Sequence, residues 1–169
     1  MRFKGLLYIT FAVIIFVVIV DQATKNLVLA NIGIGGQPII VIERFFYIVC
    51  HRNSGAAWGI LKNGRMFFLV MTPVLIIGMC VLLVRNKDML LRFALSFIIG
   101  GAIGNYIDRL FVGSVVDFLD FYIFNYNFPT FNAADSSIVL GAALLIIYSL
   151  LTGKKKGDGR DSSDSADNL

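Results

Sequence analysis

The stretch MFFLVMTPVLIIGMCVLLV, residues 66–84, contains no charged side chain, and Thr72 and Pro73 are its main departures from an apolar run. At a rise of about 1.5 Å per residue, roughly 20 residues cross the hydrocarbon core of a bilayer. The stretch therefore predicts a membrane-spanning helix, and this sets the class of fold to which the whole chain belongs.

Three further apolar segments predict helices over about residues 6–30, 90–108 and 134–152. Of the 169 residues, 57% are hydrophobic and only 15% are charged, a balance typical of membrane proteins. We interpret the first segment as a retained helix, because no small-residue cleavage site ends its apolar run before Asp21. The predicted fold class is membrane α-helical, with four transmembrane helices in a single domain over residues 1–152.

The basic residues predict how the chain is oriented in the membrane. With four spans, both termini lie on one side, and nine Lys and Arg residues fall on that side against six on the other. Because cytoplasmic segments carry the excess of Lys and Arg, we expect both termini in the cytoplasm. Residues 153–169 are polar and low in complexity, so we expect them to form a disordered cytoplasmic tail.

The two connections on the outer side differ in character. Residues 36–60 combine β-branched and aromatic residues with the turn-like sequence NSG, which predicts a small extracytoplasmic β-sheet. Residues 111–130 are rich in Phe and Tyr, side chains that favour the level of the lipid headgroups. They predict a second outer loop near the membrane surface.

Few residues are available for metal or nucleophilic chemistry. The chain has two cysteines, Cys50 and Cys80, and one histidine, His51, whereas a structural zinc site needs about four such ligands. Adjacent strand residues point to opposite faces, so Cys50 and His51 do not form a catalytic pair. The basic residues form short clusters beside apolar runs and not the stripe of a nucleic-acid-binding protein. We therefore expect no metal, no cofactor and no nucleic acid.

Aspartates at the predicted helix ends are the conspicuous polar feature of the chain. A charged side chain at the bilayer centre costs at least about 2.5 kcal/mol, so an acid in such a segment suggests a function. Asp117 follows the third helix and Asp135 begins the fourth, which places both at the same depth near the outer surface. Two neighbouring carboxylates share a proton, and such a pair can activate water against an amide carbonyl. On chemistry alone, Asp120 could replace Asp117.

Structural roles also explain several of these polar residues. Asp21 and Lys25 lie four apart on one helix face and can form an ion pair. Asn132 can cap the fourth helix, whose first turn favours an acid such as Asp135. The GxxxG sequence at residues 100–104 predicts a face for close helix packing.

Five short sequence blocks occur in a characteristic order along the chain. They resemble the motif blocks of signal peptidase II, the family of lipoprotein signal peptidases, and the chain length and four spans agree with that resemblance. The blocks are DQATK at 21–25, NSGAAWG at 53–59, GGAIGNYIDR at 100–109, GSVVDF at 113–118 and FNAADS at 131–136.

The resemblance implies an intramembrane aspartic endopeptidase with Asp117 and Asp135 as its catalytic pair, which selects Asp117 over Asp120. It also implies a set of polar residues that hold the substrate and line the site, and a set with supporting roles. The first set is Asn53, Asn105, Arg109 and Asn132, and the second is Asp21, Lys25, Gly55, Asp108 and Ala134.

The resemblance further implies a substrate, which is a bacterial prolipoprotein cut on the N-terminal side of a diacylglyceryl-modified cysteine. The enzyme would lie in the bacterial cytoplasmic membrane, in contact with lipid, with its active site near the outer leaflet. A β-cradle would occupy the outer segment, and no cofactor and no oligomer is implied. We expect Trp58 and the loop at 111–130 to cover the site and exclude water.

Two other functions are compatible with paired carboxylates in a membrane protein. A proton- or ion-coupled carrier would need carboxylates along the depth of the bilayer or broken helices at its midplane. A non-enzymatic scaffold held by interfacial ion pairs would tolerate Asn in place of Asp117 and Asp135.

Overall fold

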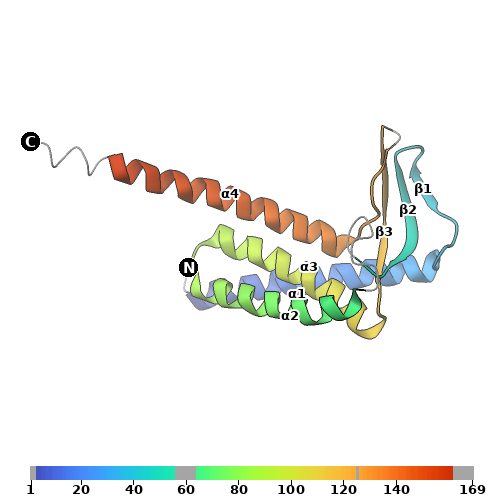
Figure 1. The fold of residues 1–169 in the computed structure, drawn as a ribbon, viewed down its shortest axis with the longest axis horizontal. Helices are drawn as coiled ribbons and strands as arrows, with labels where there is room; N and C mark the ends of the chain where they lie inside the picture. Colours follow the sequence, from blue (N-terminus) through green and yellow to red (C-terminus); the bar gives the residue numbers. More distant parts are fainter. Residues whose placement is uncertain (1–2, 56–63, 125, 162–169) are drawn as a thin grey trace, which may run out of the picture.

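The computed structural model describes residues 3–55, 64–124 and 126–161, with side chains described up to residue 152. Its long helices are α1 (Phe3–Asn31), α2 (Arg65–Arg85), α3 (Met89–Phe111) and α4 (Ala133–Asp161) (Figure 1). Each contains a segment long and apolar enough to span a membrane. The four helices expected from the apolar runs are therefore confirmed, with ends that differ by a few residues except in α4.

The end of α4 overlaps the tail over residues 153–169 that the sequence predicts to be disordered. The helix continues to Asp161, nine residues beyond Thr152, where the apolar span ends. The polar segment contains no proline, and lysine is a good helix former, so a helix already nucleated in the apolar segment can propagate through it. The disordered tail stays a prediction, and residues 162–169 lie outside the described part of the chain.

Helix α3 is the centre of the bundle and packs against the other three helices. Half of its span is buried, against 6% for α2, so α3 forms the interior and α2 faces outward. The close packing depends on glycines, because a Cβ at Gly100 would meet the side chain of Val17 on α1. A Cβ at Gly101 would meet the backbone of Ala134 on α4. The packing face predicted from the GxxxG sequence is confirmed.

One antiparallel sheet stands at one end of the helices, with its strands running across the helix direction (Figure 1). Its order is β1-β2-β3-β4, with the strands β1 (Ile39–Ile42), β2 (Phe46–Asn53), β3 (Val115–Ile123) and β4 (Tyr126–Asn127). The start of α1 and the end of α4 lie at the opposite end of the bundle. The sheet expected within residues 36–60 is confirmed for its described part, and residues 56–63, including Trp58, lie outside the described residues.

The second outer segment has a different structure from the one predicted from the sequence. Residues 111–130 do not form a separate loop, because β3 and β4 occupy much of this segment and β3 pairs with β2. The sequence VVDFLDFYI consists mainly of β-branched and aromatic residues, which favour strands, and pairing supplies partners for its backbone groups. Gly113, at φ +89°, makes the turn that leads from α3 into β3. The strand carries Asp117 onto a rigid sheet.

Candidate active site

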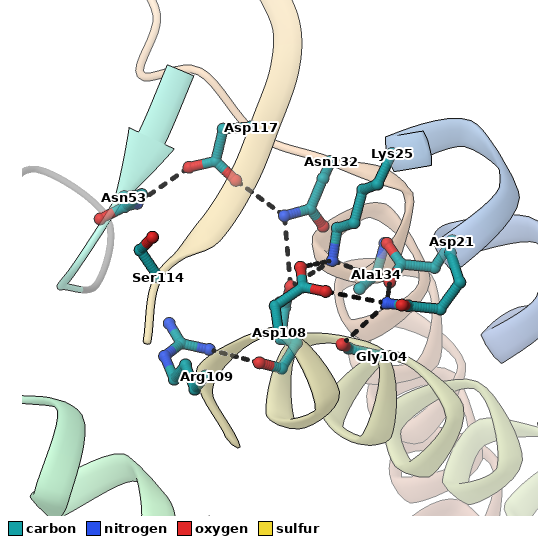
Figure 2. Close-up of polar contacts among 12 residues, drawn as sticks. Asp21, Lys25, Asn53, Gly104, Asp108, Arg109, Ser114, Asp117, Asn132 and Ala134 are labelled. Atoms are coloured by element: carbon teal, nitrogen blue, oxygen red, sulfur yellow. Dashed lines mark hydrogen bonds and ion pairs between the residues drawn. The ribbon is translucent and has the colours of Figure 1, made fainter. Parts of the chain in front are cut away.

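Asp117 lies in the middle of β3 and is almost fully buried, with 2% of its surface exposed. Its two carboxylate oxygens accept hydrogen bonds from two asparagine side chains (Figure 2). Asn53 Nδ2 donates at 2.9 Å from the end of β2, and Asn132 Nδ2 donates at 2.7 Å from just before α4. Burial raises the pKa of Asp117 to about 6, and the Asp135 charge also raises it, whereas the bonds from Asn53 and Asn132 oppose the rise.

Asp135 lies in the first turn of α4, where a carboxylate is favoured by the helix dipole. Its N–H donates to Asn132 Oδ1 at 2.9 Å, while the N–H of Asn132 donates back to Asp135 Oδ2 at 3.2 Å. This reciprocal pair has the geometry of a capping box and confirms the cap expected at Asn132. Asn105 Nδ2, from α3, donates to the other Asp135 oxygen at 2.8 Å. The two aspartates thus share one neighbour, Asn132.

A buried cluster around Lys25 supports the pair from the side of α1. The Lys25 ammonium lies 2.8 Å from Asp21 Oδ2 and 2.8 Å from Asp108 Oδ2, and it donates to Asn105 Oδ1 at 3.0 Å. Asp21 and Lys25 are 0% and 2% exposed, so both partners of this ion pair are removed from solvent. The second Asp21 oxygen accepts the N–H of Ala134 at 3.0 Å, which joins α1 to the first turn of α4.

Arg109, at the outer end of α3, joins the helix to the segment after β2. Its Nη2 donates to the carbonyl of Gly55 at 3.0 Å, and its Nη1 donates to the carbonyl of Asn105 at 3.3 Å. The guanidinium lies over the ring of Phe68 on α2, 4.4 Å from the ring centroid. Gly55 in turn donates its N–H to Asn53 Oδ1 at 2.9 Å, which orients the amide that reaches Asp117.

Asp120 lies apart from this network. It is three residues beyond Asp117 on the same strand, so its side chain points to the opposite face of the sheet. Asp120 is 6% exposed, and its Oδ1 has no hydrogen-bond partner among the described residues. Burial raises its pKa, while the charge of His51 lowers it. Asp120 therefore does not share the position of Asp117.

All eleven predicted site residues belong to one connected set of contacts, although they come from α1, the end of β2, α3, β3 and the start of α4. Sequence reasoning missed two members of that set. Gln22 donates to Asp108 Oδ1 at 3.0 Å and to the carbonyl of Gly104 at 3.2 Å. Its place inside the DQATK block was a usable signal, whereas nothing in the sequence distinguished Phe68 from the other apolar residues of α2.

The arrangement supports acid–base chemistry by two carboxylates. Asp117 and Asp135 are both held by amide donors, and among the described residues no imidazole or thiol hydrogen-bonds to either carboxylate. A raised pKa near 6 allows Asp117 to exchange a proton close to neutral pH. One carboxylate of such a pair can accept a proton from water while the other donates one.

Known proteins share both this sequence and this fold. The family model Peptidase_A8, signal peptidase (SPase) II, matches residues 13–151. A lipoprotein signal peptidase of Bacillus pumilus (strain SAFR-032) is 51% identical over 146 residues, which cover 85% of this chain and 94% of that protein.

Two solved structures of bacterial membrane enzymes, determined by the in meso method, resemble this one. The first, at 2.3 Å resolution, has a TM-score of 0.81 and 40% identity, and the match covers 87% of this chain and 90% of that one. The second, at 1.9 Å resolution, has a TM-score of 0.76 and 41% identity, covering 83% and 92%. With the family model matching most of the chain, this protein belongs to the signal peptidase II family of membrane peptidases.

Proposed function

We propose that this peptidase removes the signal peptide from bacterial prolipoproteins by hydrolysis at Asp117 and Asp135. The scissile amide lies on the N-terminal side of a cysteine that carries diacylglycerol. The observation that carries the proposal is the Asn132 side chain, which donates to Asp117 at 2.7 Å and accepts the N–H of Asp135 at 2.9 Å. One residue thereby holds both carboxyl groups of the pair.

The two carboxyl groups share one proton at working pH and divide the acid and base roles. The ionised group takes a proton from water, and the water oxygen attacks the carbonyl carbon of the scissile amide. The protonated group donates its proton to the carbonyl oxygen, which gives a neutral tetrahedral gem-diol. The carboxyl group that took the water proton then donates it to the amide nitrogen, while the other carboxylate takes a proton from a gem-diol hydroxyl. The C–N bond breaks to give an amine and a carboxylic acid, and each aspartate returns to its starting protonation state.

The polar residues around the pair divide into two tasks. Asn53, Asn105 and Asn132 hold the carboxylates in place with short amide hydrogen bonds of 2.7–2.9 Å. Arg109 fixes the segment at Gly55 and so shapes the side of the site that receives the substrate. These contacts pre-organise the pair before the substrate binds, which lowers the reorganisation needed during the reaction.

The arrangement of helices and sheet supports a position of the site near the outer leaflet. We place the sheet on the outer surface, because the basic residues favour cytoplasmic termini and the two helix termini lie at the opposite end (Figure 1). Phe124 and Tyr126, exposed at one tip of the sheet, then lie at the level of the outer lipid headgroups. A substrate held in the same leaflet by its acyl chains reaches the aspartates laterally, without leaving the lipid.

The test is cleavage of a purified prolipoprotein in detergent or in bilayers, read by mass spectrometry of the new N-terminus. We expect a mature product that begins with the diacylglyceryl cysteine. The same prolipoprotein without the lipid is the matched control, and it should be cut much more slowly. Equal cleavage of both forms would contradict the proposed role of the lipid, and cleavage of neither would contradict the proposed function.

A further inference from the structure

The side-chain amide of Asn105 lies between a cation and a catalytic aspartate. Its Nδ2 donates to Asp135 Oδ1 at 2.8 Å, while its Oδ1 accepts from Lys25 Nζ at 3.0 Å and from Asn132 Nδ2 at 3.2 Å. An amide's oxygen and NH2 group have nearly the same shape, so packing alone does not decide which one faces Asp135. The chemistry of the neighbouring groups must decide it.

Lys25 makes that decision, because an ammonium group donates and never accepts. It donates hydrogen bonds to Asp21 Oδ2 at 2.8 Å and to Asn105 Oδ1 at 3.0 Å, and it forms an ion pair with Asp108 Oδ2 at 2.8 Å. The two carboxylates hold the ammonium group in place, and the Lys25 side chain is 3% exposed. Asn105 must therefore turn its oxygen toward Lys25 and its NH2 group toward Asp135.

Asn132 is oriented in a comparable way by a different donor. The backbone N–H of Asp135 occupies Asn132 Oδ1, so the Asn132 NH2 group must face Asp117 and the Asn105 oxygen. Each aspartate thus receives an NH2 group whose direction is set by a group that can only donate. Figure 2 shows Lys25 on the α1 side of this set, with Asn132 between it and Asp117.

We propose that Lys25 is a positioning residue for the peptidase reaction, and that it acts by fixing the Asn105 amide so that this amide always donates to Asp135. Lys25 is only 2% exposed, and it touches neither catalytic carboxylate in the contacts described. The inference rests on the proposed function, since it assigns a role at the same site.

Loss of Lys25 has a defined chemical consequence for the pair. Without the ammonium, the Asn105 amide can turn over and present its oxygen to Asp135, which disfavours a carboxylate and favours the carboxylic acid. The pair then needs a higher pH to provide the carboxylate that acts as the base, so the acidic limb of the pH–rate profile moves to higher pH. Apart from Lys25, four charged or titratable groups lie around the pair: Asp21 on α1, Asp108 and Arg109 on α3, and His51 on β2. Of these, only Asp108 is changed in the experiment below.

The experiment is a double-mutant cycle on the full chain in detergent, with the diacylglyceryl prolipoprotein as substrate. Lys25→Met is combined with Asp108→Asn, which removes one charge of each sign and keeps the volumes similar. We expect kcat at pH 6 to fall at least about tenfold, the acidic limb to rise by about one pH unit and KM to change less than about threefold. In an Asn105→Ala background, the same pair of changes should add no more than about twofold, because no amide remains to be oriented.

Two results would overturn the proposal. If the variant changed at both Lys25 and Asp108 keeps the wild-type pH–rate profile, Lys25 is not needed for the reaction. If the same two changes lower kcat as much in the Asn105→Ala background as in the wild type, Lys25 acts through its charge alone. Lys25→Arg keeps a donor-only cation and both ion pairs, and its limb should stay within about 0.3 pH unit of wild type. If the acidic limb of Lys25→Arg is displaced as far as that of Asn105→Ala, the proposal is overturned. This result can be obtained even if the variant changed at both Lys25 and Asp108 does not fold. If the unaltered protein cleaves nothing, the proposed function itself fails, a result distinct from these.

Discussion

Asp21 and Ala134 are 113 residues apart in the sequence, yet Asp21 Oδ1 accepts the N–H of Ala134 at 3.0 Å. The bond caps α4 from α1 and sets the position of the first turn that carries Asp135. Both residues have no exposed surface, so water cannot replace the acceptor if Asp21 is lost. The same aspartate also holds Lys25, and the orientation of the catalytic turn therefore depends on a buried charge.

Asp21→Ala should destabilise the protein strongly. The change leaves the Lys25 ammonium with one carboxylate fewer and the Ala134 N–H without its acceptor, and breaking a buried pair in this way costs about 3–5 kcal/mol. Thermal unfolding in detergent measures it, with Thr24→Val as the matched control on the same helix. Thr24 is half-buried, but its hydroxyl donates only to backbone carbonyls of its own helix, so its loss should change stability by less than about 0.5 kcal/mol. Equal melting of the two variants would contradict the structural role of Asp21.

Asp117→Asn and Asp135→Asn should each abolish cleavage, with kcat falling by on the order of 10²–10⁴-fold or more, because each removes one half of the acid–base pair. Asp120→Asn makes the same chemical change on the opposite face of β3 and should leave kcat within about threefold. The assay is cleavage of the diacylglyceryl prolipoprotein with and without a chelator, which we expect to be harmless. Full activity in either of the first two variants would remove that aspartate from the mechanism.

The four spans and the catalytic candidates were predictable because their causes are local. An apolar run such as residues 66–84 specifies a span without reference to the rest of the chain. Asp117 and Asp135 lie inside ordered sequence blocks that signal a family. The same blocks named the residues around them, but the contacts among those residues were not predictable, because Lys25 and Asn105 are 80 residues apart and meet only when α1 packs on α3.

Strand β3 shows why the outer segment was misinterpreted. Its aromatic residues are typical both of a membrane-surface loop and of a strand, and composition does not separate the two. Pairing with β2 makes this segment a strand, and in that pairing His51 lies opposite Asp117 and Tyr47 lies opposite Asp120. That register is a tertiary property, since it depends on where α3 ends and how Gly113 turns the chain.

Gly104→Ala should destabilise the bundle and slow cleavage. A methyl group at Gly104 would run into the Asp21 carboxylate, which is buried and bound on both oxygens, so it cannot move aside. Overpacking of this kind costs about 1–3 kcal/mol. Gly78→Ala on α2 is the matched control, because a Cβ there meets nothing within 4 Å. We expect the control to melt at or slightly above the wild-type temperature, and a Gly104→Ala variant as stable as this control would contradict the packing described here.

The raised pKa of Asp117 predicts how stability depends on pH. The folded protein holds the Asp117 proton up to about pH 6, whereas the unfolded chain loses it near the ordinary value of 3.8. Stability from this group is therefore fully present below pH 3.8 and is lost as the pH rises through about 6, an effect of about 3 kcal/mol across the window. Asp120, whose pKa burial also raises, contributes in the same direction. Chemical unfolding in detergent at pH 4, 5, 6 and 7 should show the unaltered protein losing more stability over this range than Asp117→Asn, which cannot titrate there. Parallel curves for the two proteins would show that Asp117 titrates at its ordinary pKa, and the proton exchange expected of it close to neutral pH would then lose its physical basis.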